Sequence, residues 1–316
     1  MSETPKIAYV FPGQGSQDIG MGWDLYDSYA SAREAFDEAD ATLGFPLSQL
    51  CFEGPEAELT RTDNVQPAIL ATSIACLRAA QQQASDEDLP APSFVAGHSL
   101  GEYTALVAAD VLSLSDAVRL VRERGRLMYK AGEKNQGSML AIIGLEKSAV
   151  EDVCLQSGTE ISNINCPGQI VISGAVDALT EASKLAKIKS ARRVIPLKVS
   201  GAFHSSLMEP IIDEFSEAIS NFVFRPPAIP IIANVTARPL TDVNSIREEL
   251  LYQLRRCIQW QPSVEYMVQD GVNSFYEIGP GRVLSGLIKR INSEVQTLSI
   301  SGVENITQLG DSVISN

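Results

Sequence analysis

Short apolar runs alternate along this chain with longer segments in which apolar residues recur every three or four positions. The continuous runs at 7–11 and 94–96 predict buried strands. The longer segments predict helices over 22–42, 66–82, 102–109 and 115–131, and Pro67 opens the second of them at a position where proline is tolerated. This alternation of strands and helices is typical of an α/β fold.

The segment 138–199 has a pattern of its own. Strand-like and helical stretches follow one another there in the order β-α-β-β-α-β, which is the ferredoxin-like arrangement. We therefore predict a large α/β-hydrolase-like domain formed by residues 1–135 and 200–316. An inserted ferredoxin-like (βαββαβ) subdomain is predicted over residues 136–199, and we expect an active site between the two.

A serine flanked by glycines lies between a predicted strand and a predicted helix. The sequence Gly97-His98-Ser99-Leu100-Gly101 has the pattern G-x-S-x-G, in which glycines allow the sharp turn that lifts a serine hydroxyl towards solvent. Nearby backbone N–H groups can then receive an oxyanion. A chance glycine turn is the alternative, but the strand-turn-helix context favours a nucleophile at Ser99.

A serine nucleophile needs a base, and the chain contains only two histidines. His98 is next to Ser99 in the turn, where its side chain is expected to point away from the hydroxyl. His204 is therefore the candidate base, and the order serine before histidine matches α/β-type serine enzymes. A purely structural histidine is the alternative, and the presence of the nucleophile turn favours the base.

Arg124 breaks the polarity pattern of the predicted helix at 115–131. At about 100° per residue, Arg119, Arg122 and Arg126 lie on the polar face, whereas Arg124 falls within the apolar arc. A buried guanidinium keeps its charge and must find an anion or several acceptors. An internal ion pair with an Asp or Glu is one interpretation. The other is a site for a substrate carboxylate, held by two parallel hydrogen bonds.

The composition limits the classes of function. The chain has 316 residues, is 45% hydrophobic and 20% charged, and is long enough for one large α/β domain with an insertion. Its formal net charge of −14 argues against nucleic acid as a partner. Five scattered cysteines without a C-x-x-C pair predict neither a disulfide framework nor a metal site. Residues 1–6 lack a signal-peptide pattern and no apolar run is long enough to cross a membrane, so we expect a cytoplasmic protein.

A glycine-containing loop at 12–17 follows the first predicted strand. Its spacing suggests a dinucleotide fingerprint, but Asp18 occupies the third glycine position and excludes that motif. The glycines allow a ligand to come close to the backbone, where Gln14 offers an amide. A simple turn is the alternative.

Taken together, these residues resemble the malonyl-CoA:acyl-carrier-protein transacylase family of fatty acid synthesis. The resemblance covers nearly the whole chain and includes the β-α-β-β-α-β insertion. It departs at Cys166, where relatives often carry serine. The motifs are F-P-G-Q-G-S-Q at 11–17, G-H-S-L-G-E-Y at 97–103, R-G at 124–125, N-I-N-C-P-G-Q at 163–169, G-A-F-H-S at 201–205, Q-W at 259–260 and E-I-G-P-G at 277–281.

The resemblance implies a role for each of the residues that react. Ser99 is implied as the nucleophile, His204 as the base and Arg124 as the residue that binds the malonyl carboxylate. In this family a backbone carbonyl, rather than an aspartate, is the third member of the triad. The matching position in this sequence is Gln259.

The resemblance also implies how the acyl group is held. Gln14 and the backbone N–H of Leu100 are implied to line the oxyanion hole. His98 and Asn165 match positions in the pocket. Phe203 resembles the malonyl-selective pattern, in which the aromatic ring leaves little room for an α-methyl group.

The implied reaction is ping-pong transfer of malonyl from malonyl-CoA to the phosphopantetheine thiol of holo acyl carrier protein. No cofactor or metal, no nucleic acid and no membrane are expected, and a monomer is expected. Carrier proteins of this family are acidic, so a local basic patch should exist, with an ordinary solvated surface as the alternative. One candidate cluster is Lys184, Lys187, Lys189, Arg192 and Arg193, and the other is Arg282, Lys289 and Arg290.

Three other functions fit parts of the pattern. A serine thioesterase or carboxylesterase would release the free acid and would not need Arg124. A catalytically idle subunit that binds acyl carriers would not need Ser99, His204 and Arg124 intact. A standalone acyltransferase of polyketide synthesis shares these motifs.

Overall fold

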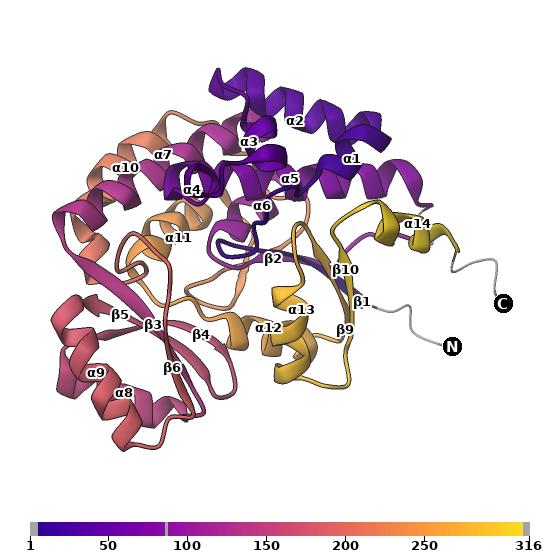
Figure 1. The fold of residues 1–316 in the computed structure, drawn as a ribbon. Coiled ribbons are helices and arrows are strands. Elements are labelled where there is room, and N and C mark those ends of the chain that lie inside the picture. The colour runs from indigo at the N-terminus through magenta and orange to yellow at the C-terminus, as the bar shows by residue number, and fades with distance from the viewer. Residues whose placement is uncertain (1–5, 86–87, 312–316) are drawn as a thin grey trace.

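The structure, a computed structural model, describes residues 6–85 and 88–311. In these residues the chain forms a six-stranded mixed sheet covered by helices, and a separate four-stranded antiparallel sheet that carries two helices (Figure 1). The predicted α/β class with an inserted βαββαβ unit is confirmed. The predicted domain limits, 1–135 and 200–316 against 136–199, stay a prediction. None of the helices in the described part of the chain combines the length and apolarity of a membrane span.

The larger sheet brings the ends of its two central strands together. Its order is β10-β9-β1-β2-β7-β8, and the strands are parallel except in the β7–β8 hairpin. β1 and β2 are paired so that Phe11 lies beside Gly97. The loops that follow them therefore begin at the same edge, where parallel sheets bind ligands. The strands are β1 (Lys6–Phe11), β2 (Phe94–Gly97), β7 (Ile231–Ile232), β8 (Pro239–Leu240), β9 (Val272–Ile278) and β10 (Gln296–Ile300).

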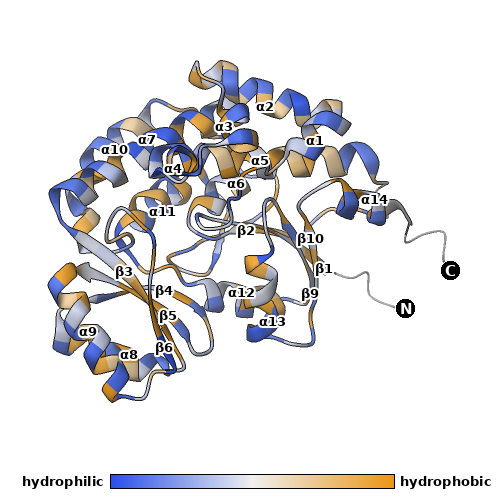
Figure 2. Ribbon diagram, viewed as in Figure 1, coloured by the Kyte–Doolittle hydropathy of each residue, from blue (hydrophilic) through white to orange (hydrophobic). Residues whose placement is uncertain are grey.

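Both faces of the larger sheet are buried. Along β1, Tyr9 and Phe11 face one apolar core, and Ala8 and Val10 face another. The strands of both sheets are mainly orange and white in Figure 2, whereas the helices carry alternating blue and orange bands, as amphipathic helices should. The helices around this sheet are α1 (Trp23–Ser28), α2 (Ala30–Leu43), α3 (Leu47–Glu53), α4 (Glu56–Leu59), α5 (Thr62–Gln83), α6 (Leu100–Ala108), α7 (Leu114–Lys134), the 3-10 helix η1 (Ser206–Ile211), α10 (Ile212–Ser220), α11 (Val243–Arg255), α12 (Trp260–Gln269), α13 (Val283–Ile291) and α14 (Val303–Asp311).

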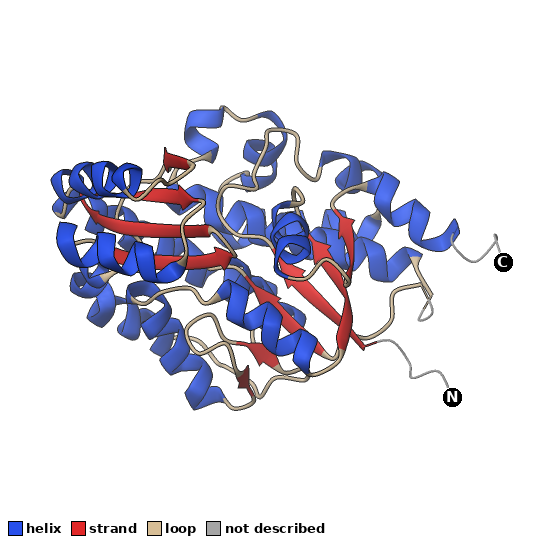
Figure 3. Cartoon of the chain, turned by 90° about the horizontal axis from the view of Figure 1, so that it is seen from below, coloured by secondary structure: helices blue, strands red, loops and turns tan. Residues whose placement is uncertain are grey.

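The smaller sheet has the order β4-β5-β3-β6, and all of its neighbouring strands are antiparallel. Its two helices pack on one face (Figure 1). Figure 3 shows the two sheets side by side as separate groups of strands. The elements are β3 (Gly137–Ile143), α8 (Lys147–Ser157), β4 (Glu160–Cys166), β5 (Gln169–Ala175), α9 (Val176–Ile188) and β6 (Arg193–Pro196), so the last strand ends before the predicted residue 199.

The helix predicted over 22–42 is two helices. Tyr29 separates α1 from α2 with φ −121° and ψ 126°, an extended conformation that ends the first helix. The polarity pattern continues through this residue, so the break leaves no trace in the spacing of apolar positions.

The helix predicted over 66–82 begins earlier, and Pro67 lies inside it. Proline cannot donate to the carbonyl four residues before it, which is that of Asp63. Arg122 of α7 takes that place, because its Nη1 donates to Asp63 O at 2.7 Å. A contact from another helix thus satisfies the acceptor that the proline leaves open.

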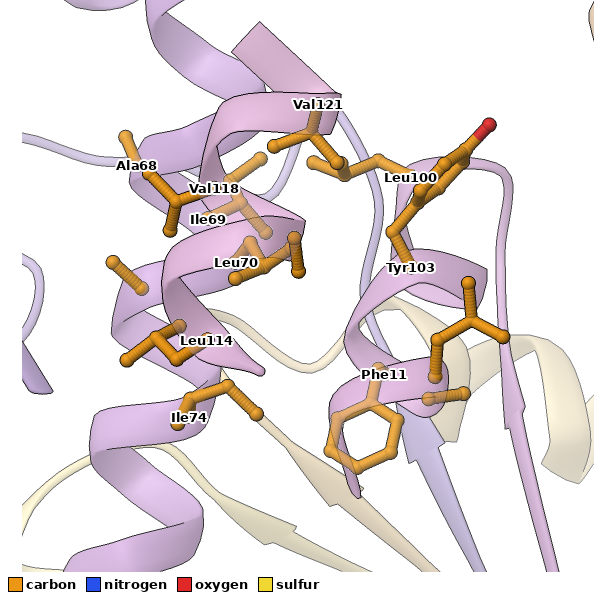
Figure 4. Close-up of a cluster of buried hydrophobic side chains, with 14 of the residues drawn as sticks. Phe11, Ala68, Ile69, Leu70, Ile74, Leu100, Tyr103, Leu114, Val118 and Val121 are labelled. Carbon is orange, nitrogen blue, oxygen red and sulfur yellow. The ribbon is translucent and has the colours of Figure 1, made fainter. Parts of the chain in front are cut away.

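Helices α5, α6 and α7 form the core behind the nucleophile turn. Residues 62–77 of α5 are all buried. Figure 4 shows Leu70 of α5 close to Val118 of α7, and Leu100 of α6 close to Val121 of α7. This packing fixes the helix that begins immediately after Ser99.

Candidate active site

Ser99 lies on a sharp turn between β2 and α6. Its φ of 52° and ψ of −102° are outside the usual regions for a residue with a side chain. A Cβ at Gly97 would overlap the backbone of Gly101, and a Cβ at Gly101 would overlap the carbonyl oxygen of Phe11. Close packing therefore requires both glycines. The Ser99 N–H donates to Asn234 Oδ1 at 2.7 Å, which anchors the strained residue.

His204 lies within hydrogen-bond distance of this serine. Its Nε2 is 2.8 Å from Ser99 Oγ, and its Nδ1 is 2.6 Å from the main-chain oxygen of Gln253. A carbonyl only accepts hydrogen bonds, so Nδ1 carries the proton and the lone pair of Nε2 faces the serine. Burial, and after it the charge of Arg124, lower the pKa of His204 to about 3. The imidazole is therefore a neutral proton acceptor at physiological pH.

Arg124 is 1% exposed, and its guanidinium points at the nucleophile. Nη2 donates to Ser99 Oγ at 3.1 Å and to Gln253 Oε1 at 2.8 Å, and Nη1 donates to Gln66 Oε1 at 2.8 Å. The guanidinium also lies over the Tyr103 ring, 5.1 Å from its centroid.

Among the residues that the structure describes, Arg124 forms no ion pair with a carboxylate. The first interpretation of this arginine, an internal salt bridge, is therefore wrong. Two neutral amide oxygens occupy the positions that a carboxylate would take. The Nε of Arg124 has no partner, so the guanidinium retains donor capacity for an anion that enters the site.

A cavity of about 280 Å³ opens in front of Ser99, His204 and Arg124. Its walls come from both sheets: the loop after β1 and the nucleophile turn on one side, and β3, β4 and β5 on the other. Phe203 lines it beside the base. No group of three His, Cys, Asp or Glu side chains in the described part of the chain is placed as metal ligands would be.

His98 points away from the nucleophile. Its Nε2 is 2.9 Å from Asn165 Oδ1, and its ring centroid is 5.7 Å from that of Trp260. Burial lowers the pKa of His98, so this ring is neutral as well. A Cβ at Gly13 would overlap the carbonyl oxygen of His98, which shows how closely the loop of Gln14 packs on the nucleophile turn.

The comparisons with known proteins agree with this geometry. A protein-family model described as an acyl transferase domain matches residues 8–309. The malonyl CoA-acyl carrier protein transacylase of Bacillus subtilis (strain 168) is 46% identical over 306 residues, which are 95% of each chain. The chain belongs to the malonyl CoA-acyl carrier protein transacylase family.

Solved structures of the family have the same fold. An acyl carrier protein S-malonyltransferase from Vibrio cholerae matches with a TM-score of 0.92 and 41% identity, over 96% of this chain and 99% of that one. A malonyl-transacylase in complex with its type II PKS acyl-carrier protein matches with a TM-score of 0.93 and 38% identity, over 97% and 99%.

The structure brings most of the predicted site residues to one cavity. Their catalytic and binding roles stay a prediction. The predicted site residues among those that line the cavity are Gln14, His98, Ser99, Leu100, Arg124, Asn165, Phe203 and His204. Leu100 is the first residue of α6, where an N–H has no partner within the helix and is available to an oxyanion.

Gln259 is not the residue whose carbonyl contacts His204, so the assignment of Gln259 as the third member of the triad is wrong. Its carbonyl accepts from the N–H and the hydroxyl of Ser263, at 2.9 and 2.8 Å, at the start of α12. The carbonyl on His204 Nδ1 is that of Gln253, six residues earlier. It lies in the last turn of α11, where carbonyls have no partner within the helix and are free to accept from another segment.

Sequence reasoning missed Gln253, Gln66 and Asn234. The buried positions of α11 are Ile246, Glu249, Leu250, Gln253 and Leu254, which have the spacing of an apolar stripe. Two polar residues within that stripe are the same signal that singled out Arg124. Gln66 precedes Pro67 in a wholly buried helix, and Asn234 lies in a short loop without any pattern.

Proposed function

We propose that this chain transfers malonyl from malonyl-CoA to the phosphopantetheine thiol of holo acyl carrier protein, through a malonyl ester on Ser99, and so supplies fatty acid biosynthesis. One observation carries the proposal: Ser99 Oγ lies within hydrogen-bond distance of a neutral imidazole and of a guanidinium that has no carboxylate partner in the described residues. A thioesterase or carboxylesterase needs the first group only. A substrate with a free acid explains the second.

In the first half-reaction, His204 Nε2 takes the proton of Ser99 as Oγ attacks the thioester carbon. The negative charge that develops on the thioester oxygen is stabilised by the N–H of Leu100 and by Gln14, which both line the cavity beside Ser99. The carbon–sulfur bond breaks, and the proton on His204 passes to the leaving CoA sulfur. The Gln253 carbonyl stabilises the transient imidazolium through Nδ1–H.

In the second half-reaction, His204 takes the proton of the phosphopantetheine thiol, and the thiolate attacks the malonyl ester. The ester carbon–oxygen bond breaks, and the proton returns to Ser99 Oγ. Water must be excluded for transfer to exceed hydrolysis. The narrow cavity, with Phe203 in its wall and Arg124 at the malonyl carboxylate, supports that exclusion.

The surface around α13 is the better of the two candidate docking sites for the acidic carrier protein. Val283, Leu284 and Leu287 of this helix line the cavity, and Arg290 Nη1 donates to Gln169 Oε1 at 2.6 Å at its rim. In the other cluster, Lys184 pairs with Glu181 and Lys189 with Asp152 on α9 and α8. This proximity of α13 to the cavity supports the cluster Arg282, Lys289 and Arg290 as the docking site.

Intact mass after incubation with malonyl-CoA, acetyl-CoA and methylmalonyl-CoA tests the function. We expect a stable malonyl adduct that disappears in Ser99→Ala and that holo acyl carrier protein discharges. Rapid release of free malonate without an adduct would favour the thioesterase. The monomeric state and the cytoplasmic location stay predictions, and size-exclusion chromatography with light scattering tests the first.

A further inference from the structure

One glutamine connects the groups that meet at the nucleophile. Gln253 is fully buried near the end of α11. Its main-chain oxygen accepts from His204, and its side-chain oxygen accepts from Arg124. Its side-chain nitrogen donates to the main-chain oxygen of Ser99 at 2.9 Å and to Oε2 of Glu102. A single residue thus contacts the base, the guanidinium and the backbone of the nucleophile.

Glu102, together with the main-chain oxygen of Ser99, determines the orientation of that amide. This carboxylate is fully buried in α6, three residues after the nucleophile. A carboxylate only accepts hydrogen bonds, so the amide of Gln253 must turn its NH₂ group to Glu102 and its oxygen to Arg124. A guanidinium only donates, so this is the one orientation of the amide that Arg124 can use.

Glu102 also supports the other side of the nucleophile turn. Its Oε1 accepts the N–H of Asn234 at 2.9 Å. The side chain of Asn234 accepts from the N–H of Ser99 and donates to the oxygen of Gly97, both at 2.7 Å. The two oxygens of one carboxylate therefore hold the two residues that bind the backbone of Ser99.

The arrangement separates the charge of Arg124 from its counter-charge by one amide. A buried cation needs a negative charge nearby, and a carboxylate in direct contact would compete with the carboxylate of a substrate. Neutral amide oxygens from Gln66 and Gln253 occupy the direct positions instead. An acyl group with one free carboxylate displaces such neutral oxygens more readily than it displaces a carboxylate.

The neighbouring Glu249 affects the titration of Glu102. Burial, and after it the charge of Glu249, raise the pKa of Glu102, and burial raises the pKa of Glu249 to about 7. Both oxygens of Glu102 accept hydrogen bonds from N–H donors, as those of an ionised carboxylate do.

We propose that Glu102 is a positioning residue for substrate selection: through the amide of Gln253 it keeps Arg124 oriented and free of a direct carboxylate partner, ready for the malonyl carboxylate. Glu102 itself does not line the cavity. The proposal rests on the proposed malonyl transfer and adds the group that sets its selectivity.

Glu102→Gln tests it, because this variant keeps the shape and removes the charge. Its single amide oxygen cannot accept from both Asn234 N–H and Gln253 Nε2, so one donor stays unpaired or Gln253 turns its NH₂ group against Arg124. We expect kcat/KM for malonyl-CoA in the acylation of Ser99 to fall about 10- to 100-fold, mainly through a higher KM. The value for acetyl-CoA should change far less.

Two further variants separate positioning from general support. Glu249→Gln also removes a buried carboxylate, but its Oε1 accepts from Val235 N–H, so the malonyl-to-acetyl ratio should stay as in the wild type. Gln253→Leu keeps the main-chain oxygen on His204 and removes the amide. It should reproduce the selectivity change of Glu102→Gln, and it decides the question if that variant does not fold.

Equal falls for malonyl-CoA and acetyl-CoA in Glu102→Gln and Gln253→Leu would overturn the proposal, as would a selectivity change in Glu249→Gln of the same size. Either result would mean that the network supports the fold rather than the selection of malonyl over acetyl groups. If the wild-type protein forms no malonyl ester on Ser99, the proposed function itself is refuted, independently of Glu102.

Discussion

Replacing Arg124 with alanine should convert a malonyl-selective site into a poorly selective one. In the resting protein its guanidinium makes three hydrogen bonds, of which two go to neutral amides and one to Ser99 Oγ. A malonyl carboxylate would gain two charge-assisted hydrogen bonds at about 1.5–3 kcal/mol each. Subtracting about 1 kcal/mol for each of the two exchanged amide bonds leaves a loss of about 2.5 kcal/mol, or about 70-fold in kcat/KM for malonyl-CoA.

Acetyl-CoA has no carboxylate and should lose little, so the malonyl-to-acetyl ratio should collapse. The assay is the rate of Ser99 acylation by each acyl-CoA, followed by intact mass. Arg126→Ala is the matched control, because Arg126 is on the same helix but is exposed and paired with Glu123. An unchanged ratio in Arg124→Ala would refute the carboxylate role, and equal falls for both substrates would make Arg124 a structural support.

The same variant has a second signature in its pH profile. The charge of Arg124 is the second cause, after burial, of the low pKa of His204. Without that charge the imidazole binds a proton more readily, so the acid limb of the acylation rate should move to higher pH. Burial remains, so the pKa should stay below the ordinary value of 6.5. An acid limb at the wild-type position would contradict this electrostatic coupling.

Three further results are expected. Folded His204 has a pKa of about 3 against 6.5 when unfolded, so the unfolded chain binds the extra proton and the free energy of unfolding should fall as pH drops below 6.5. The contribution of His204 to the slope of the unfolding free energy against pH should not exceed about 1.4 kcal/mol per pH unit, which is the limit for one titrating group. Comparing urea unfolding of the wild type with that of His204→Asn isolates this contribution. Arg290→Glu should raise the KM for carrier protein and spare malonyl-CoA, whereas Lys184→Glu should affect neither; equal effects of Arg290→Glu on both substrates would exclude docking there. Gly101→Ala should lower the Tm or prevent folding, because its Cβ would overlap the oxygen of Phe11, and a Tm equal to that of the wild type would contradict the packing argument.

Local signals were sufficient to predict the fold class and to single out Ser99, His204 and Arg124, which the structure brings together. The alternation of short strand-like and helical segments predicts the βαββαβ order, and the glycine pattern predicts the nucleophile turn. Arg124 violates the polarity of its helix, which a single sequence reveals. The ends of the helices were harder to predict from the sequence. Helix α5 extends through Pro67 because Arg122, from another helix, binds the carbonyl that the proline leaves free.

The group that orients His204 was beyond such reasoning for a physical reason. Any residue supplies a main-chain carbonyl, so neither composition nor spacing marks the one that is used. Gln253 is chosen by its place in the last turn of α11, which only the packing of that helix against the base determines. Its side chain was accessible in principle, as a polar residue in an apolar stripe.

The use of a carbonyl rather than a carboxylate on His204 follows from the charge of the proposed substrate. A carboxylate at that position would place a negative charge close to the malonyl carboxylate, and two unit charges about 6 Å apart repel by about 3 kcal/mol at an effective dielectric constant of about 20. The carbonyl of Gln253 orients the imidazole without that charge. The one carboxylate of this network, Glu102, lies on the far side of the Gln253 amide, where it can balance Arg124 without occupying its donors. The site thus keeps a local positive charge at the nucleophile, although the whole chain carries a net charge of −14.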